Sequence, residues 1–220
     1  METKLLSDHA EDLLEAAELL RNGAVVGMPT ETVYGLAADA RNPEAVRQIF
    51  AAKGRPADNP LIVHIAEMRA LEQVAATVPP LAEKLAERFW PGPLTMILPK
   101  RKEIPEITSG GLDTVGIRMP SHPVARALIQ LSGVPIAAPS ANISGYPSPT
   151  TAQHVMRDMQ GKIAAVVDGG ACSVGVESTV IALEPNGTVR ILRPGFVTKE
   201  MLEEVAPEVT LDPAILHQLQ

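Results

Sequence analysis

Residues 42–65 read NPEAVRQIFAAKGRPADNPLIVHI, and this stretch decides the class of fold. The side chain of Asn42 is suited to cap a helix, and Pro43 after it suits the first helical position. Gly54 stands where a residue in the left-handed conformation would end that helix. The apolar run at residues 61–65 then predicts a buried strand. A helix that leads directly into a buried strand is typical of α/β layer structures.

The same alternation of helix and strand patterns continues on both sides of this stretch. Asp8 and Glu11 have the spacing of a capping box that opens a helix, and Gly23 is placed to end it. Residues 185–187, Pro-Asn-Gly, predict a tight turn between antiparallel strands. We expect further helices over residues 80–89, 121–133, 151–159 and 198–205, and strands over residues 24–28, 94–98, 115–119, 135–138, 163–167, 178–183 and 188–192.

Composition narrows the class of protein. The 220 residues suit one domain, and a hydrophobic content of 45% is enough for a sizeable core. A net charge of -7 and only 3% aromatic residues argue against a broad nucleic-acid surface or stacking platforms. The lone Cys172 excludes an internal disulfide and a cysteine-rich zinc site. With no signal-peptide pattern and no apolar run of roughly 18 residues, we expect a soluble, cytoplasmic protein without a membrane segment.

Two cations, Lys53 and Arg55, lie on either side of Gly54. One interpretation is that they only complete the end of a helix, where a cation gains about 0.3–1 kcal/mol from the helix dipole. The other is anion binding, because lysine supplies a point charge and arginine a planar fork, which together suit a triphosphate. The amide of Asn59, at a rigid turn before the strand, favours the second interpretation.

Other polar residues lie within or beside strands. A single histidine such as His64 in an apolar strand is more often a core residue than a catalyst, and no second ligand has the spacing of a zinc site. Arg118 shares a strand face with Thr114 and Gly116, so it either faces solvent or forms the wall of a wet cleft.

Loops of small polar residues follow apolar strands at PTETVYGL, residues 29–36, and PSANISG, residues 139–145. Both fit plain turns in which hydroxyl and amide groups satisfy the backbone. Both also fit ligand contacts at the ends of sheet strands. The chain has neither the P-loop pattern nor the dinucleotide-binding glycine pattern, so those two nucleotide folds lose their usual support.

A family resemblance rests on strings that occur in the order PTETVYGL, KGRPADNPLIVHI, FWPGPLT, VGIRMP, APSAN, GVESTVI and ILRPG. Over residues 6–195 the chain resembles the YrdC-type family of threonylcarbamoyl-AMP synthases. The resemblance implies a single α/β domain, a twisted sheet of mixed parallel and antiparallel strands with flanking helices and a large concave cavity. Longer members carry an extra C-terminal domain, so residues 196–220 are expected to be a C-terminal extension or linker stub of a short form.

The resemblance also implies an activity. Similar enzymes are nucleotidyltransferases that condense L-threonine, bicarbonate and ATP to threonylcarbamoyl-AMP and pyrophosphate, with Mg²⁺ as cofactor. Their product serves threonylcarbamoyladenosine modification of tRNA, so downstream tRNA threonylcarbamoyl-transfer proteins are expected partners, and RNA binding is an open question.

The family's site residues carry over by matching motif. The expected ATP-binding residues are Lys53, Arg55, Asn59, Thr114, Ser140, Asn142, Ser148 and Arg193. The expected threonine-binding residues are Thr32, His64, Arg118, the Ala138 backbone and Ser178. Lys53, Arg55 and Arg118 are also expected to be catalytic through their charge. Mg²⁺ is expected to be bridged by the phosphates of ATP, with Asn142 as a nearby candidate ligand and no side chain firmly assigned to the metal.

Two other functions remain open at this point. The concave face could bind double-stranded RNA or tRNA without catalysis, although the net acidity of the chain favours a small-molecule pocket. The domain could instead form a carbamoyl-adenylate for other acceptors, as in hydrogenase-maturation proteins with a related domain, although the accessory segments of those proteins are missing. Pyrophosphate release that depends on threonine and bicarbonate selects the synthase, RNA binding without turnover selects the RNA-binding module, and dependence on carbamoyl phosphate selects the third function.

Overall fold

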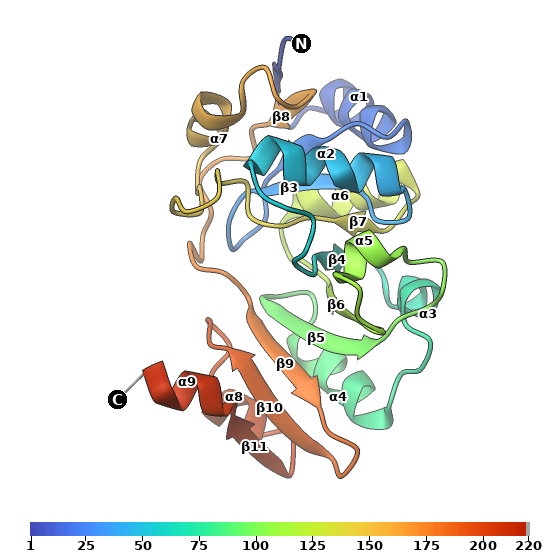
Figure 1. Cartoon of the computed structure of the whole chain (residues 1–220), viewed down its shortest axis with the longest axis vertical. Helices are drawn as coiled ribbons and strands as arrows, with labels where there is room; N and C mark the ends of the chain where they lie inside the picture. Colours follow the sequence, from blue (N-terminus) through green and yellow to red (C-terminus); the bar gives the residue numbers. More distant parts are fainter. Residues whose placement is uncertain (219–220) are drawn as a thin grey trace.

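An eleven-stranded sheet runs through residues 1–218, the part of the chain that the computed structural model describes (Figure 1). From one edge to the other the strands are β1 (Lys4–Leu6), β8 (Ala165–Val167), β2 (Val26–Met28), β3 (Gly35–Asp39), β7 (Ile136–Ala137), β4 (Ile62–His64), β6 (Thr114–Arg118), β5 (Leu94–Pro99), β9 (Thr179–Leu183), β10 (Thr188–Arg193) and β11 (Glu208–Leu211). The sheet contains both parallel pairs, such as β4 with β6, and antiparallel pairs, such as β5 with β6. The predicted single α/β domain with a mixed sheet is confirmed.

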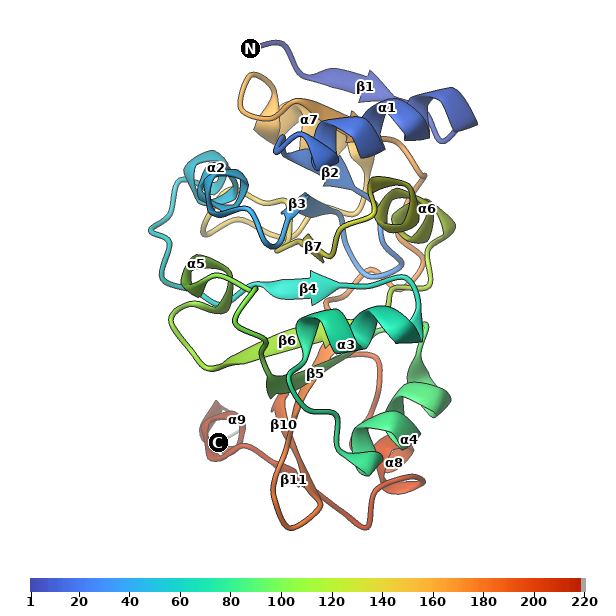
Figure 2. The same ribbon diagram turned by 90° about the vertical axis from the view of Figure 1, so that its right-hand side faces the viewer.

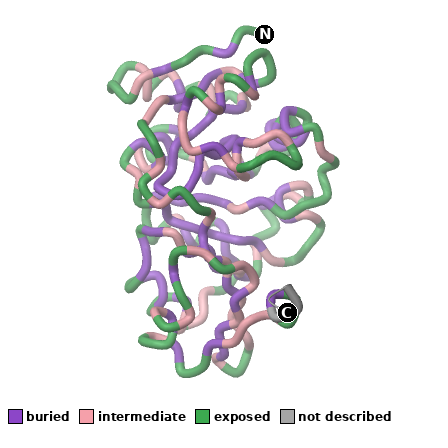
Figure 3. Tube along the Cα trace, turned by 90° about the vertical axis from the view of Figure 1, so that its left-hand side faces the viewer, coloured by how far each residue is buried: buried purple, intermediate pink, exposed green. Residues whose placement is uncertain are grey.

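Helices cover both faces of the sheet, as the side view in Figure 2 shows. They are α1 (Ala10–Arg21), α2 (Pro43–Lys53), α3 (Leu71–Val74), α4 (Pro80–Phe89), α5 (Glu106–Ser109), α6 (Pro123–Ser132), α7 (Ala152–Met159), α8 (Lys199–Glu203) and α9 (Pro213–Gln218). On β8, Ala165 and Val167 pack with α1 and α6, whereas Val166 packs with α7. This alternation follows from the two-residue period of a strand. In Figure 3 the buried segments run through the interior along the length of the molecule, and exposed segments lie mainly at its outside.

The helix predicted from residues 42–65 has the expected ends. The Asn42 side chain accepts hydrogen bonds from the Glu44 and Ala45 amides, and Pro43 begins α2. Gly54 closes the helix with φ 69°, in the left-handed region that favours glycine. The chain then runs through the turn to β4, so α2 and β4 place the two cations and Asn59 at one end of the sheet.

The capping box predicted at the start of α1 is wrong. His9 precedes the helix, and neither Asp8 nor Glu11 makes the predicted cap. The carboxylate of Asp12 instead accepts hydrogen bonds of 2.8 Å from the backbone and hydroxyl of Ser7. The helix thus begins one residue later than predicted, directly after the edge strand β1 and this turn, and the sequence did not predict β1.

The predicted turn at residues 185–187 joins β9 and β10, and their antiparallel pairing is confirmed. The extension or linker stub is expected over residues 196–220, of which residues 219 and 220 lie outside the described part. Residues 196–218 add β11 beside β10 in parallel. Leu202, Val209 and Ile215 from this segment belong to the main hydrophobic core. The domain boundary at residue 195 stays a prediction. Within residues 1–218, no helix combines the length and the apolar character that crossing a membrane requires.

Candidate functional site

A cavity of about 210 Å³ lies against the middle of the sheet. Its wall comes from the loop between β2 and β3, the end of α2, strand β4, the end of β6, the loop after β7 and the facing ends of β9 and β10. Most of the residues predicted for ATP or threonine line it: Thr32, Lys53, Arg55, Asn59, His64, Arg118, Ala138, Ser140, Ser178 and Arg193. The fold therefore brings positions far apart in sequence to one hollow, and their individual roles stay predictions.

Three predicted residues do not line this cavity within the described chain. Asn142 and Ser148 each lie one hydrogen bond away from it: Asn142 Oδ1 accepts from Lys53 Nζ at 3.3 Å, and Ser148 Oγ donates to Glu177 Oε1 at 3.1 Å. Thr114 begins β6 opposite Pro99, at the far end of the strand from Arg118. The predicted ATP contact of Thr114 stays a prediction.

The ammonium group of Lys53 joins α2 to the loop after β7. Its Nζ donates to the Ser140 carbonyl at 2.5 Å and to the Asn142 carbonyl at 3.0 Å. The Lys53 carbonyl in turn accepts from the Ser144 amide at 3.0 Å. Burial, and to a smaller extent Arg55, lower the pKa of Lys53 to about 8, while Glu177 opposes the change. Lys53 is thus still mainly a cation at pH 7.

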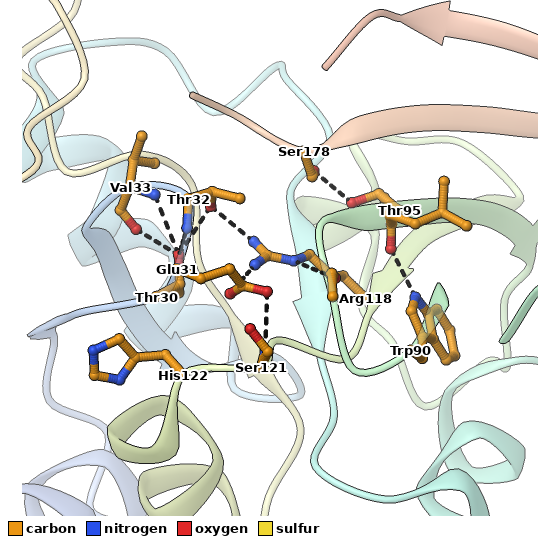
Figure 4. A network of polar contacts seen from close by, with 12 residues as sticks. Thr30, Glu31, Thr32, Val33, Trp90, Thr95, Arg118, Ser121, His122 and Ser178 are labelled. Carbon is orange, nitrogen blue, oxygen red and sulfur yellow. Dashed lines mark hydrogen bonds and ion pairs between the residues drawn. The ribbon is translucent and has the colours of Figure 1, made fainter. Parts of the chain in front are cut away.

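Protein acceptors hold Arg118 at all three nitrogens of its guanidinium (Figure 4). Nε donates to the Gly92 carbonyl at 3.2 Å, Nη1 donates to Thr32 Oγ1 at 3.0 Å, and Nη2 pairs with Glu31 Oε1. The side chains of the pair are only 4% and 6% exposed. Burial lowers the pKa of Arg118, and Glu31 opposes that change. The predicted solvent-facing alternative for Arg118 is therefore wrong, because the side chain is buried at the cavity wall.

The carboxylate of Glu31 is held from both ends. Its second oxygen, Oε2, accepts from the Ser121 amide at 2.9 Å. Burial acts to raise the pKa of Glu31, but Arg118 and the Ser121 amide outweigh it, so the pKa lies below its usual value. Both members of the pair are therefore charged at neutral pH.

The hydroxyl groups beside Arg118 form a row of hydrogen bonds in which each hydroxyl accepts from one neighbour and donates to the next. Thr32 Oγ1 accepts from Arg118, so its own proton points to Thr30 Oγ1 at 2.9 Å. Thr30 Oγ1 then donates to the Val33 carbonyl at 2.7 Å. Taken together, the three contacts show which hydroxyl is the donor in the Thr30–Thr32 hydrogen bond, which the distance alone does not. They also connect the loop between β2 and β3 to Arg118.

His64 lies beside Arg118 in the next strand of the sheet, and its Nδ1 lies 3.1 Å from the Ile62 carbonyl. Because a carbonyl can only accept, Nδ1 carries a proton. Burial, and to a smaller extent Arg118, lower the pKa of His64 to about 3. A neutral imidazole can bound the cavity and form hydrogen bonds there, but it adds no positive charge.

Arg193 closes the opposite side of the cavity. Nε and Nη2 both donate to the Ser178 carbonyl, at 3.0 Å and 2.8 Å, and Nη1 donates to Glu177 Oε2 at 3.0 Å. Burial lowers the pKa of Arg193 while Glu177 opposes the change. A Cβ atom at Gly195 would lie 2.6 Å from the Thr179 amide nitrogen, so only glycine allows the chain after β10 to approach so closely.

The sequence analysis missed two acidic residues of this site, Glu31 and Glu177. Each pairs with an arginine, Arg118 or Arg193, that the sequence did single out. The only sequence signal was their position inside the strings PTETVYGL and GVESTVI. Nothing in those strings states which distant cation each carboxylate meets.

Within residues 1–218, no group of three or more His, Cys, Asp or Glu side chains is placed to hold a metal ion. The cavity wall nevertheless contains the carboxylate of Glu177, with the Asn142 amide nearby. Mg²⁺ is usually held by one or two carboxylates together with substrate phosphates and water. The donor set therefore fits a Mg²⁺ ion that arrives with a polyphosphate.

A family model and close relatives point to the same protein family. A family model named for Sua5, YciO and YrdC, with the description "Telomere recombination", matches residues 18–195. A threonylcarbamoyl-AMP synthase of Pyrococcus abyssi is 56% identical over 200 residues, which cover 91% of this chain and 58% of that protein. Its counterpart in Bacillus subtilis is 52% identical over 218 residues, covering 98% and 62%.

A solved structure gives the same family. The crystal structure of P. abyssi Sua5 complexed with L-threonine matches with a TM-score of 0.93 and 51% identity, covering 98% of this chain and 64% of that one. The Escherichia coli YciO structure, at 22% identity and a TM-score of 0.78, shares the fold. This chain thus spans about three fifths of the length of the P. abyssi and B. subtilis relatives. The matched residues include every loop of the cavity, and the chain belongs to the Sua5/YciO/YrdC family.

Proposed function

We propose that this chain is an L-threonylcarbamoyladenylate synthase, a nucleotidyltransferase that joins L-threonine, bicarbonate and ATP and releases pyrophosphate. The observation that carries the proposal is the gathering of Lys53, Arg55, Arg118 and Arg193 around one cavity in a chain of net charge -7. Such a hollow suits two anionic reactants at once. Relatives at 52–56% identity that are named threonylcarbamoyl-AMP synthase support the same activity.

The reaction has two bond-forming stages. The amine of threonine attacks the carbon of bicarbonate and water leaves, which gives an N-carboxy anion. A carboxylate oxygen of this intermediate attacks the α-phosphorus of ATP. The bond between the α-phosphorus and its bridging oxygen breaks, and pyrophosphate carries away the electron pair. Both reactants of the second stage are anions, so positive charge is needed before they can approach each other.

The amino acid would lie beside Arg118. One N–H on each terminal nitrogen of its guanidinium has no partner among the described residues, and these two groups can receive the α-carboxylate. The hydroxyls of Thr32 and Ser178, neutral His64 and the Ala138 backbone complete the wall around it. The P. abyssi relative described as complexed with L-threonine supports an amino-acid subsite in this fold.

The nucleotide would lie with its phosphates along Lys53, Arg55, Asn59, Ser140 and Arg193. Glu177 and Asn142 would hold Mg²⁺ together with the phosphates, and the ion would supply further positive charge at the transferring group. The chain's own cations would fix the reacting atoms at short distance and lower the repulsion between the two anions. Arrangements of this kind reach effective molarities of about 10⁵ M or more.

The cavity contains no pair of groups suited to acid–base work. His64, with a pKa of about 3, is neutral, and the carboxylates of Glu31 and Glu177 are both engaged by arginines. We therefore attribute catalysis to positioning and electrostatic stabilisation. In our proposal the reaction takes place in the cytoplasm, and the unstable adenylate passes to proteins that transfer its threonylcarbamoyl group to tRNA.

The experiment that tests this function is an omission series. The protein is incubated with ATP, Mg²⁺, bicarbonate and L-threonine, and pyrophosphate release is followed while one reactant at a time is left out. Release that requires all of them supports the proposal. Release without threonine or bicarbonate contradicts it. RNA binding without turnover, or turnover that needs carbamoyl phosphate, would assign the cavity to one of the two other functions.

A further inference from the structure

Glu31 is a buried carboxylate to which the proposed function gives no task. We propose that Glu31 is the positioning residue for Arg118: it fixes the plane of the guanidinium so that two of its N–H groups face an α-carboxylate in the cavity. The inference rests on the proposed function, because that function supplies the amino-acid ligand. If it is correct, recognition of the ligand's carboxylate requires Glu31 as well as Arg118.

The first argument is location. Thr30, Thr32 and Arg118 line the cavity, whereas Glu31 does not belong to its wall in the described chain. The Glu31 side chain is 6% exposed, and in Figure 4 its carboxylate lies between the guanidinium and Ser121. Glu31 therefore cannot touch a ligand in the cavity, and any effect on binding must pass through Arg118.

The second argument is the geometry around Arg118. A guanidinium has five N–H donors in one plane, and three directions are taken by fixed acceptors: Gly92 O on Nε, Thr32 Oγ1 on Nη1 and Glu31 Oε1 on Nη2. Gly92 and Thr32 are neutral acceptors, so the contact with Glu31 is the one ion pair among these three. Once these contacts are made, rotation of the planar group would break all of them together.

The third argument is that Glu31 is itself immobilised. Oε2 accepts the Ser121 amide at 2.9 Å, so one carboxylate joins the loop before β3 to the loop after β6. A glutamine in this place keeps the shape, but one of its two ends would be an NH₂ group facing another donor. An aspartate keeps the charge but is one methylene shorter and cannot span both Arg118 and the Ser121 amide.

The test compares two ligands rather than one. L-threoninol lacks the carboxylate of L-threonine, so the ratio of their dissociation constants, measured by calorimetry, reports how well Arg118 recognises the carboxylate. We expect wild-type protein to prefer threonine clearly. In Glu31→Gln and in Glu31→Asp we expect that preference to fall about tenfold, since an oriented charge-assisted contact is lost, while the affinity for threoninol changes little. ATP affinity should stay within about twofold.

A matched control carries the same chemical change elsewhere. Glu184 pairs with Arg190 Nε at 3.2 Å in the β9–β10 hairpin, so Glu184→Gln removes an arginine-bound carboxylate outside the cavity. This variant should keep the wild-type preference. Thermal unfolding of each protein shows whether the fold is retained, and Glu31→Asp, which keeps the buried charge pair, decides the matter if Glu31→Gln does not fold.

Each outcome has one meaning. A reduced preference for the carboxylate in both Glu31 variants supports the inference. A wild-type preference in Glu31→Asp would show that only charge matters, and an equal loss for threonine and threoninol would show a structural role; either result overturns it. If wild-type protein binds neither ligand, the proposed function fails and the inference falls with it.

Discussion

Lys53 Nζ lies 2.5 Å from the carbonyl oxygen of Ser140, so the lysine at the end of α2 holds the loop that follows β7. The Asn142 carbonyl and side-chain oxygen are further acceptors for the same ammonium. A residue predicted from sequence to bind phosphate is therefore also the link between two walls of the cavity. Its charge state should affect both the loop and the nucleotide.

ATP affinity should depend on pH through Lys53. Its pKa is lowered to about 8, chiefly by burial, so the ammonium is present below that pH and is lost above it. If the cation holds ATP phosphates, the dissociation constant for ATP should be flat below pH 8 and rise about tenfold per pH unit above it. Titration of ATP binding between pH 6.5 and pH 9.5 measures this directly.

Lys53→Arg provides the control, because arginine stays protonated over the whole range. Its ATP affinity is expected to be lower than that of wild type at pH 7, since the planar group cannot reproduce the three contacts of the ammonium. It should show no break near pH 8. A wild-type profile that stays flat through pH 9.5 would contradict the role of Lys53 in binding phosphate.

Arg118→Lys should raise the KM for threonine by roughly 10- to 100-fold. Lysine offers one point charge in place of a fork and loses the contacts with Gly92 and Thr32, and charge-assisted hydrogen bonds are worth about 1.5–3 kcal/mol each. The KM for ATP should change far less. Steady-state kinetics with each substrate varied in turn separates the two effects, and unchanged threonine kinetics would refute the role of Arg118.

Glu177→Gln should tighten the binding of inorganic tripolyphosphate when Mg²⁺ is removed with EDTA. The Glu177 carboxylate accepts from Arg193 Nη1 at 3.0 Å and from Ser148 Oγ at 3.1 Å, so it occupies donors that we assign to phosphate. The Arg193–Glu177 pair is more than a third exposed, which limits the expected gain to about two- to fivefold. Glu184→Gln should show no gain, and weaker binding by Glu177→Gln would contradict the competition between carboxylate and phosphate.

Gly195→Ala should destabilise the protein and weaken ATP binding together. The added Cβ would lie 2.6 Å from the Thr179 nitrogen and 2.7 Å from the Glu177 carbonyl, so the segment that holds Arg193 must move. Overpacking of this kind costs about 1–3 kcal/mol of the free energy of unfolding. Urea denaturation and ATP titration measure the two effects.

Gly133→Ala is the matched change for Gly195→Ala. Gly133 ends α6 at φ 72°, so alanine is strained there, but no atom lies within 4 Å of its added Cβ. We expect a loss of about 1 kcal/mol in the free energy of unfolding and unchanged ATP binding. Equal loss of ATP binding in both glycine variants would show that the effect is general destabilisation.

Local signals predicted much of the fold correctly. Asn42, Pro43 and Gly54 defined α2 to the residue, because caps and turn glycines act on their immediate neighbours. Strand β3, Gly35–Asp39, was missed because its small residues have neither bulk nor alternation, although the sheet buries most of them. The edge strands β1 and β11 were also missed, since each depends on pairing with a partner distant in sequence.

For the site, too, residues within motifs could be predicted from the sequence, whereas contacts between residues far apart in the sequence could not. Family motifs named the cations, and the fold brings Lys53, Arg55, Arg118 and Arg193 to one cavity. The acid that fixes Arg118 could not be predicted, because Glu31 and Arg118 are 87 residues apart and meet only after β2, β3 and β6 are in place. Thr114, which also matched a motif, begins β6 at the end opposite Arg118, and its role stays a prediction.

Isotope tracing gives the most direct test of the account as a whole. Protein incubated with ATP, Mg²⁺, L-threonine and ¹³C-bicarbonate should produce an adenylate whose mass includes threonine, AMP and one labelled carbonyl carbon. The same incubation with Arg118→Lys should produce far less of it at low threonine concentration. An adenylate that lacks the label, or the absence of any threonine-containing nucleotide in the wild-type reaction, would contradict the claim that this cavity joins the three substrates.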